Sequence, residues 1–436
     1  MTNRSASQLR FPGCKGRQIE ADFSGGNVTS DAGVLLVRQA DLRLGLTASV
    51  ANQFKDSRRQ ASCQHSVLSM LRQRVYGLAA GYEDLNDHDS LRHDLAWQTA
   101  VGRDAPTASS PTLCRLENRA DRAMAIAMHQ VLVEQFIASY PEPPTELILD
   151  FDATDDPVHG MQEGRFFHGY YDHYCFLPLY VTCADRLLVA YLRPANIDGA
   201  RHAWAILSLL VKRLRAAWPG VRIIFRGDSG FCRWKMLAWC ERKGVHYIVG
   251  LARNKRINEQ AAHLIDQAKN RFAATGRKQR LFGNLRYAAH TWDKPRRVIA
   301  RIEHNRQGEN PRYVVTNLPG NARKLYERIY CQRGEMENRI KEQMQLFSDR
   351  TSASRWWPNQ LRVLLSALAY TLLEAVRRLG LKGTAMARAQ VNTIRLKLLR
   401  IGAVVLRNTR RVRFLLSSAH PHQGLFELVA QRLAPD

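Results

Sequence analysis

Residues 146–156, ELILDFDATDD, combine an apolar strand pattern with a group of aspartates at its end. Successive side chains of a β-strand point to opposite faces. One face of this strand is apolar, with Leu147, Leu149 and Phe151. The other carries Asp150 and Asp152, and two buried carboxylates are costly unless a metal ion or hydrogen-bond donors meet them. The segment therefore predicts a buried strand that ends at a functional site, with Asp152 as the candidate residue.

The segments that follow residue 156 repeat short apolar runs separated by two helical patterns. The strand-like runs are CFLPLYVTCAD (175–185), RLLVAYLRPA (186–195), VRIIFRGD (221–228) and VHYIVGLAR (245–253), and the helical patterns are HAWAILSLLVKRLRAAW (202–218) and WKMLAWCERKG (234–244). The order is β-β-β-α-β-α-β. Hairpins can join the first three strands, whereas the later strands need crossovers through helices. This order matches the RNase H-like core.

A second aspartate lies where the same site is expected. Asp228 ends the fourth strand in the motif FRGDSGF. In open α/β sheets, sites form at the carboxyl ends of strands, and strands one and four are neighbours in the RNase H order. Asp228 is therefore expected beside Asp152. Taken alone, either aspartate fits a turn or a cap, as Asp155 and Asp156 do after the first strand.

The third candidate is Glu337, in the helical segment RIYCQRGEMENRIKE, residues 328–342. At about 100° per residue, one stripe of this helix carries Tyr330, Arg333, Glu337 and Lys341. Glu335 is turned roughly 160° away from Glu337, so the stripe favours Glu337. An exposed helix with ion pairs between residues four apart is the simpler alternative.

These three carboxylates suit a pair of magnesium ions. Attack on a phosphodiester needs a deprotonated nucleophile and a stabilised leaving oxygen, which two Mg²⁺ ions about 3.5–4 Å apart supply. Mg²⁺ prefers carboxylate oxygens and needs no histidine or cysteine ligand. We expect Mg²⁺, with Mn²⁺ as its substitute, at Asp152, Asp228 and Glu337. The 8 cysteines contain no CxxC pair, so a zinc site is not predicted.

The formal net charge of +26 implies a polyanionic partner, and nucleic acid is the first candidate. Residues 375–426 contain many arginines and lysines but no acidic residue. A solvated surface normally mixes both signs, so this run favours phosphate contact. The residues expected to contact DNA phosphates are Arg395, Lys397, Arg410 and Arg411. A basic globular protein without such a partner is the plainer alternative.

Several motifs together resemble the signature of bacterial insertion-sequence DDE transposases. The motifs are LDFDATDD (149–156), RGDSGF (226–231) and Y-x2-R-x3-E at Tyr330, Arg333 and Glu337. Further similar stretches are GYEDLNDHDSLRHD (81–94), SSPTLCRLENR (109–119) and HGYYDHYCFLPLY (168–180). The resemblance thus covers nearly the whole chain, and it is to the group with a β-rich insertion before the catalytic glutamate.

The resemblance implies that Asp152, Asp228 and Glu337 are the catalytic metal ligands. It also implies that Tyr330 and Arg333 contact phosphates at a transposon end. Several relatives have a lysine seven residues after the glutamate, where this chain has Met344. Lys341, one turn earlier on the same stripe, is the candidate substitute. The implied partners are double-stranded DNA, as transposon ends and target, and a second copy of the chain.

The tryptophans carry a weaker prediction. Trp292 lies in the insertion, where it is a candidate for stacking an unpaired base, although a structural role is the plainer explanation. Trp356 and Trp357 follow the catalytic helix and fit either a core or a wedge between bases.

The expected fold is α/β, an RNase H-like mixed β-sheet core with flanking helices, a β-rich insertion and all-helical amino- and carboxyl-terminal regions. The expected parts are a helical DNA-binding region (1–143), the first part of the catalytic core (144–253), the insertion (254–320), the core helix (321–360) and a basic helical region (361–436).

The expected function is cleavage at transposon ends and joining of the 3′-hydroxyl to target DNA. The alternatives are an RNase H-like nuclease without strand transfer and a non-catalytic DNA-binding protein derived from a transposase. No run of about 18 apolar residues and no secretory signal is present, so no membrane partner is expected. The expected location is the cytoplasm, in association with the nucleoid.

Overall fold

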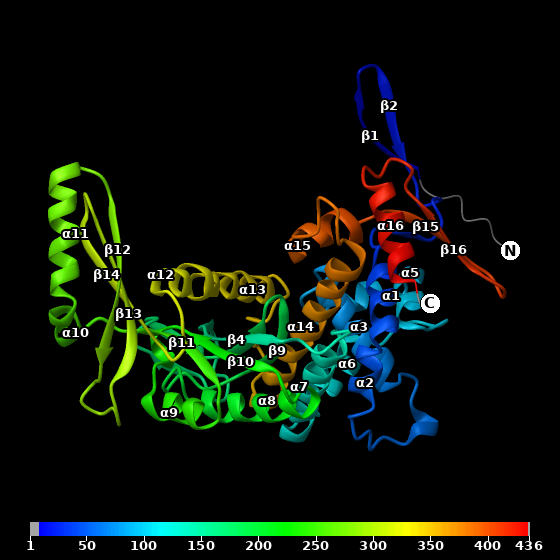
Figure 1. Cartoon of the computed structure of the whole chain (residues 1–436). Coiled ribbons are helices and arrows are strands. Elements are labelled where there is room, and N and C mark those ends of the chain that lie inside the picture. The colour runs from blue at the N-terminus through cyan, green and yellow to red at the C-terminus, as the bar shows by residue number, and fades with distance from the viewer. Residues whose placement is uncertain (1–7, 435–436) are drawn as a thin grey trace. The chain divides into compact units, whose positions relative to one another are not determined.

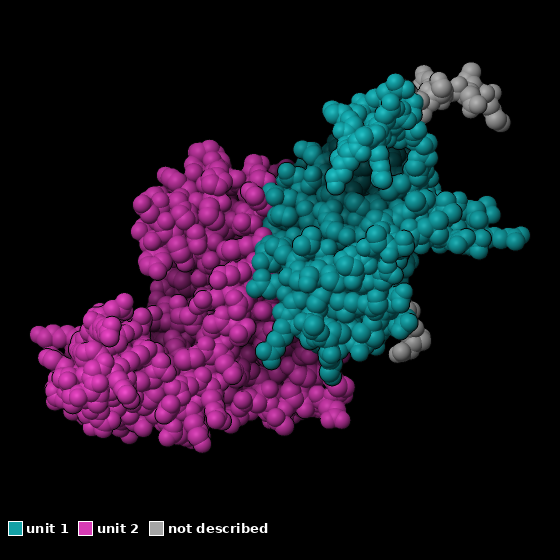
Figure 2. Space-filling view, turned by 90° about the horizontal axis from the view of Figure 1, so that it is seen from above, with its two compact units in different colours: residues 1–120, 345–347, 368–436 teal, residues 121–344, 348–367 magenta. Residues whose placement is uncertain are grey.

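The computed structural model describes residues 8–434 and divides the chain into two compact units. Unit 1 comprises residues 1–120, 345–347 and 368–436, and unit 2 comprises residues 121–344 and 348–367 (Figure 2). The long helix α14 (Trp356–Ala375) contributes to both units. Within residues 8–434, no helix is long and apolar enough to cross a lipid bilayer.

Unit 2 is built on a mixed sheet of 8 strands in the order β12-β13-β14-β11-β10-β4-β8-β9. Its core strands are β4 (Glu146–Ala153), β8 (Leu179–Cys183), β9 (Arg186–Tyr191), β10 (Arg222–Gly227) and β11 (His246–Leu251). Strand β8 runs antiparallel to β4, whereas β10 is parallel to both β4 and β11. This is the predicted RNase H order, with the first and fourth strands side by side.

The two faces of β4 pack in different layers, as its alternating sequence predicts. Leu149 and Phe151 are buried in the cluster that includes side chains of α8 (Ala203–Ala217) and α9 (Trp234–Arg242). On the other face, Ile148 packs beside a cluster that contains Leu325. Figure 1 shows α8 and α9 on one side of the sheet, with α12 (Ala322–Lys324) and α13 (Gly334–Met344) on the other.

The insertion extends the same sheet. Its strands are β12 (Gln279–Tyr287), β13 (Arg296–Asn305) and β14 (Gly308–Thr316), and β14 pairs with β11. The strand-like sequences RLFGNLRYAAHTW (280–292), RRVIARIEH (296–304) and RYVVTNL (312–318) overlap these three strands in turn. Two helices that the sequence did not suggest come first, α10 (Lys255–Gln260) and α11 (Ala262–Thr275). Helix α11 buries only Ala268, so its apolar stripe is too thin to recognise.

A small three-stranded sheet lies between β4 and β8 along the chain. It consists of β5 (Asp156–Pro157), β7 (His173–Phe176) and β6 (Phe166–His168), in that order. The prediction of one strand over residues 175–185 is therefore wrong. The chain leaves one sheet and enters another at Leu177 and Pro178, where Leu177 donates its N–H to the carbonyl of Arg193. Pro178 has no N–H to continue a ladder.

Unit 1 contains a helical core, as predicted. Its main helices are α1 (Val34–Leu44), α2 (Leu46–Ala51), α3 (Val67–Ala80), α4 (Asp87–Leu91), α5 (Leu95–Val101), α6 (Ser110–Glu117), α15 (Val391–Ile394) and α16 (Gln423–Leu433). The predicted helical region 1–143 also contains α7 (Arg122–Ala138), but this helix belongs to unit 2. Helix α3 is central and begins at Ser66, whose hydroxyl accepts the N–H of Ser69.

The expectation that both terminal regions are all-helical is wrong. Strands β1 (Leu9–Cys14), β2 (Arg17–Ala21) and β3 (Val28–Thr29) precede α1, and β15 (Ala403–Arg407) and β16 (Val412–Leu416) precede α16. The sequences AVVLR and VRFLL are rich in β-branched and aromatic residues, which favour strands. At the turn between them, the side chain of Asn408 accepts the N–H groups of Arg410 and Arg411. Figure 1 shows this hairpin projecting from the helices of unit 1.

Candidate active site

Asp152 and Asp228 leave two neighbouring parallel strands side by side. Strand β10 pairs with β4 in a register that sets Gly227, its last residue, opposite Phe151, and the residue that follows each of them along the chain is an aspartate. Asp228 also accepts the N–H of Gly230 at 2.8 Å and so caps the tight turn that follows β10. The register of the sheet thus brings together two acids that lie far apart in the sequence.

Asp150, on the same face of β4 as Asp152, has a different environment. Its carboxylate forms a buried ion pair with the guanidinium of Arg226, which donates from Nη2 to Oδ2 at 2.6 Å. The same guanidinium donates to the carbonyl of Ile329, in the segment that leads to α13. Arg226 therefore joins the sheet to the glutamate-bearing segment, and it balances the charge of Asp150.

The segment that carries Glu337 approaches the strand ends through an irregular helix. A π-helical turn, Leu325–Tyr330, is followed by a 3₁₀ turn, Cys331–Arg333, and then by α13. Such π turns occur frequently at functional sites. The guanidinium of Arg333 lies 3.1 Å from Oδ2 of Asp152 and 3.3 Å from Oε1 of Glu337, so it bridges two of the three predicted carboxylates.

The site is electrostatically coupled. Burial raises the pKa of Asp152 to about 6, the guanidinium of Arg333 opposes this shift, and the negative charges of Asp228 and Glu337 add to it. The side chain of Asp152 is only 13% exposed, whereas that of Glu337 is 55% exposed. A cation bound near Asp152 reduces the repulsion that the charges of Asp228 and Glu337 exert on this carboxylate.

The chemistry of the donor set fits a hard divalent cation only in part. Asp152 and Asp228 offer oxygen ligands on adjacent strand ends, as Mg²⁺ prefers. Glu337, in contrast, is held by Arg333. Across residues 8–434, no group of three histidine, cysteine, aspartate or glutamate side chains is placed to hold a metal ion.

Gly250 is a site residue that sequence reasoning missed. A Cβ atom at this position of β11 would lie 2.7 Å from the hydroxyl of Tyr330 and 2.7 Å from the backbone nitrogen of Ser229, next to Asp228. Only glycine leaves this space. Gly250 therefore lets Tyr330 reach the turn that holds Asp228. A glycine inside an apolar strand was the available signal in VHYIVGLAR.

The other residues of unit 2 that were predicted to contact DNA, Lys341 and Trp292, differ in their exposure. Lys341 is exposed on α13, one turn beyond Glu337. Trp292 is partly buried against the main core of unit 2, with the ring of Tyr287 at 5.7 Å and the guanidinium of Arg296 at 5.4 Å. These contacts agree with the structural alternative for Trp292. Trp356 likewise packs against Phe176, at 5.5 Å between ring centroids.

The basic residues predicted near the carboxyl terminus also differ from one another. Arg410 and Arg411 are exposed in the β15–β16 turn, and Lys397 is half-buried. Arg395 is used inside unit 1, where it donates to the carbonyls of Leu78, Ala79 and Gln345 and to the side chain of Asn392. Burial lowers the pKa of Arg395 to about 10. The guanidinium of Arg395 therefore stabilises the packing of unit 1 through these hydrogen bonds.

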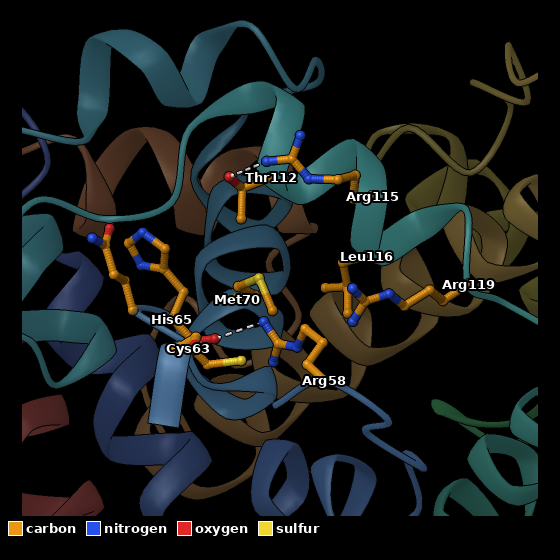
Figure 3. A pocket seen from close by; sticks show the side chains of 10 residues that line it. Arg58, Cys63, His65, Met70, Thr112, Arg115, Leu116 and Arg119 are labelled. Carbon is orange, nitrogen blue, oxygen red and sulfur yellow. Dashed lines mark hydrogen bonds between the residues drawn. The ribbon is translucent and has the colours of Figure 1, made fainter. Parts of the chain in front are cut away.

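A basic pocket lies in unit 1, between the start of α3 and helix α6 (Figure 3). Arg58, Arg115 and Arg119 line it together with His65. Arg115 donates to the hydroxyl of Thr112 at 3.1 Å, and Arg58 donates to the backbone carbonyl of His65 at 2.9 Å. Asp56 pairs with Arg58 at 2.6 Å and with Arg119 at 3.6 Å, so part of the positive charge at this pocket is balanced within the protein. Arg115 is exposed at the pocket and is suited to contact an anion such as a phosphate.

Comparison with known proteins finds a matching family and similar solved structures. The family model described as transposase DDE domain group 1 matches residues 11–436. A chain from the cryo-EM structure of a piggyBac transposase synaptic complex with hairpin DNA aligns with a TM-score of 0.43 and 10% sequence identity. The alignment covers 94% of this chain and 86% of that chain. No curated protein matches the chain.

Proposed function

The chain belongs to the transposase DDE domain group 1 family, and from this membership we propose that it cuts DNA at the ends of its own mobile element and joins the freed 3′-hydroxyl to target DNA. One observation carries the proposal. Asp152 and Asp228 lie on adjacent strand ends, and Arg333 links Asp152 to Glu337. These contacts support the proposal, because phosphodiester chemistry uses carboxylates and a guanidinium that lie near one another.

We assign Asp152, Asp228 and Glu337 the role of metal ligands, with Mg²⁺ as the ion and Mn²⁺ as its substitute. Two such ions, when bound, supply an activated nucleophile and stabilise the leaving oxygen. For Glu337 to join the two aspartates, its 3.3 Å contact with Arg333 must be exchanged for the ion. Arg333 is then available for a phosphate oxygen, which its planar guanidinium binds through two N–H groups.

Tyr330 and Lys341 complete the proposed grip on the DNA strand next to the cut. The hydroxyl of Tyr330 lies against Gly250, beside the backbone of Asp228. Lys341 is exposed one turn further along α13, on the same stripe as Glu337. A strand that follows this stripe passes the carboxylates and then meets the lysine. Trp292 is less suited to stack a base, because its ring packs against the core of unit 2.

Unit 1 is the proposed site of terminal inverted-repeat binding. The exposed Arg115, which lines the basic pocket, supports a phosphate contact there. The exposed Arg410 and Arg411 support a second contact through the β15–β16 hairpin, and a two-stranded ribbon fits the major groove of DNA. Because two ends must be held at once, we propose a homodimer assembled on DNA.

The function is tested with DNA that carries the sequences flanking the gene. Those flanks are searched for imperfect inverted repeats, and a linear substrate containing both repeats is incubated with the protein and Mg²⁺. Cuts at the outer edges of the repeats, followed by joining to a second DNA, are expected. Cuts without joined product indicate a nuclease, and tight binding without cuts indicates a DNA-binding protein.

Removal of the two hairpin arginines is expected to weaken DNA binding at every sequence. Each lost phosphate contact lowers the slope of log affinity against log salt by about 1, so the double variant Arg410→Ala/Arg411→Ala lowers it by about 2. Fluorescence anisotropy with a labelled duplex at increasing NaCl measures the slope.

Arg306→Ala is the matched control for this measurement. Arg306 is an exposed arginine in the β13–β14 turn of unit 2, so its loss removes charge from a similar hairpin. The slope is expected to stay near the wild-type value in this variant. An equal fall per arginine in both hairpins shows instead that only total charge matters.

A further inference from the structure

The hairpin of β1 and β2 projects from unit 1 and is exposed along its whole length (Figure 1). Its turn is formed by Lys15 and Gly16, which have φ angles of 49° and 78°. Positive φ at both central residues is typical of the type I′ turn, whose twist matches that of two antiparallel strands. The sequence therefore defines the tip of the hairpin, although the strands of the hairpin add no buried side chain to the core of unit 1.

One face of this hairpin is apolar. The register sets Phe11 opposite Ile19, and Leu9, two residues before Phe11, lies opposite Ala21. Paired residues, and residues two apart on one strand, point to the same face, so these four side chains form one apolar stripe. In this stripe Phe11 is 52% exposed, Leu9 is 43% exposed and Ile19 is 41% exposed. Contiguous exposed apolar surface of this kind marks binding sites.

The opposite face of the hairpin is polar, and its charges are balanced. Arg10 lies opposite Glu20 and pairs with its carboxylate at 3.4 Å, and the same carboxylate accepts a hydrogen bond from the side chain of Gln8 at 2.7 Å. The tip adds two further cations, because Lys15 and Arg17 are both exposed at the turn. The hairpin thus combines an apolar stripe along one face with a cationic tip.

The β1–β2 hairpin shares its base with the β15–β16 hairpin. Strand β3 follows β2 after residues 22–27 and pairs with β15, where Val28 lies opposite Val404. The N–H of Val405 also donates to the carbonyl of Asn27 at 2.8 Å. Two hairpins with cationic tips therefore start from one three-stranded sheet, β16-β15-β3.

The charge of the chain indicates what the β1–β2 hairpin binds. A second copy carries the same net charge of +26 and repels the tip. Double-stranded DNA attracts the tip, since Lys15 and Arg17 can each contact a phosphate. Proteins that bind the minor groove combine such cations with apolar side chains that enter between base steps and kink the duplex. Phe11, the aromatic ring of the apolar stripe, has the chemistry of such a wedge.

We propose that the β1–β2 hairpin is an arm that bends double-stranded DNA. Its tip contacts phosphates beside a minor groove, and its apolar stripe lies in the groove with Phe11 between two base steps. The proposal deepens the proposed function, on which it rests for the identity of the partner. A bent duplex contacts more protein surface than a straight one, so the arm lets one chain hold a longer stretch of DNA.

The test separates bending from binding. Full-length protein is mixed, in EDTA so that no cleavage occurs, with a duplex of about 30 base pairs that carries a fluorescence energy-transfer pair at its ends. Wild type is expected to bring the two labels closer together, because apolar wedges kink a duplex by roughly 20–90°. At saturating protein, Phe11→Ala is expected to lose most of this bend, whereas Phe11→Leu, which retains an apolar wedge, is expected to keep most of it.

The salt dependence of binding measures the phosphate contacts of the same arm. The double variant Lys15→Ala/Arg17→Ala is expected to lower the slope of log affinity against log salt by about 2. Phe11→Ala is expected to leave this slope unchanged, which also shows that its hairpin is intact. Phe23→Ala is the matched control for the bend, because Phe23 is 93% exposed and lies just beyond β2, outside the apolar stripe. It is expected to bend DNA as wild type does.

Several results overturn the inference. A bend of wild-type size in Phe11→Ala shows that the apolar stripe does not enter the groove. An unchanged salt slope in Lys15→Ala/Arg17→Ala shows that the tip does not contact phosphates. A protein dimer in wild type that is lost in Phe11→Ala, as measured by sedimentation without DNA, assigns the apolar stripe to a second copy of the chain.

The proposed function can fail without this inference, and the reverse also holds. A protein that never cuts its element ends but bends DNA through Phe11 retains the arm as a DNA-binding element. A protein that cuts normally, with equal bends in wild type and Phe11→Ala, retains only the proposed function. Because Phe11 and Phe23 are exposed, unchanged thermal melting of their variants is expected and checks the folding of the chain.

Discussion

Glu337→Gln is expected to lower the rate of DNA cleavage at element ends on the order of 10³-fold. A metal ion contributes several kcal/mol of charge stabilisation in the transition state, and each 1.36 kcal/mol corresponds to about a factor of ten. A glutamine keeps the size of the side chain but removes the charge that holds the ion. Single-turnover cleavage of a labelled end with Mg²⁺ measures the rate.

Glu335→Gln is the matched control, because it makes the same chemical change two residues away on the same helix. Glu335 is turned away from Glu337 and is expected to leave the rate within about twofold of wild type. Equal rates in wild type and Glu337→Gln exclude Glu337 from the site. Similar losses in both variants indicate a general effect of charge on this helix.

Arg226→Met is expected to destabilise unit 2 strongly. The substitution leaves Asp150 as a buried carboxylate without its partner, which costs about 3–5 kcal/mol. It also removes the hydrogen bond from Arg226 to the carbonyl of Ile329, which connects the sheet to the π-helical turn. A fall in melting temperature of roughly 10 °C or more is expected in calorimetry.

The control for this prediction is on the same pair of strands. Arg222 of β10 pairs with Glu146 of β4 at 3.4 Å, but both side chains are well exposed, at 42% and 38%. Exposed pairs contribute about 0–1 kcal/mol, so Arg222→Met is expected to change the melting temperature little. The double change Asp150→Leu/Arg226→Met is expected to regain much of the loss, because two apolar groups replace the pair. Equal effects at positions 222 and 226 contradict the assignment.

The order of the core strands was predictable because it depends on local patterns. Apolar runs such as ELILDFD are buried on both faces, and the helical patterns between the later strands require parallel crossovers. The positions of Asp152 and Asp228 follow from that order. The parallel register then sets the two aspartates side by side.

The different environments of Asp150 and Asp152 were not predictable from strand alternation, because both lie on one face. What separates them is Arg226, which lies on the neighbouring strand opposite Asp150. Its position two residues before Asp228 was a usable signal. The 3.1 Å contact of Arg333 with Asp152 depends on the π-helical turn, which no periodicity reveals.

The basic carboxyl-terminal run shows why charge alone does not identify a binding surface. Arg395 and Arg410 look alike in the sequence. The guanidinium of Arg395 donates hydrogen bonds to backbone carbonyls, whereas Arg410 lies in an exposed turn. The difference arises from tertiary packing around α3 and from the β15–β16 hairpin. Short strands rich in β-branched residues were the missed signal.

We propose that Asp152, Asp228 and Glu337 form one site for two metal ions. Mn²⁺ binding to the complex of protein and element-end DNA, followed by electron paramagnetic resonance, tests it most directly. Wild type is expected to bind two coupled Mn²⁺ ions, and Asp228→Asn, which loses a ligand of the site, is expected to lose the coupled signal while still binding the DNA. A coupled signal of wild-type strength in Asp228→Asn, or no coupled pair in the wild-type complex, contradicts the claim.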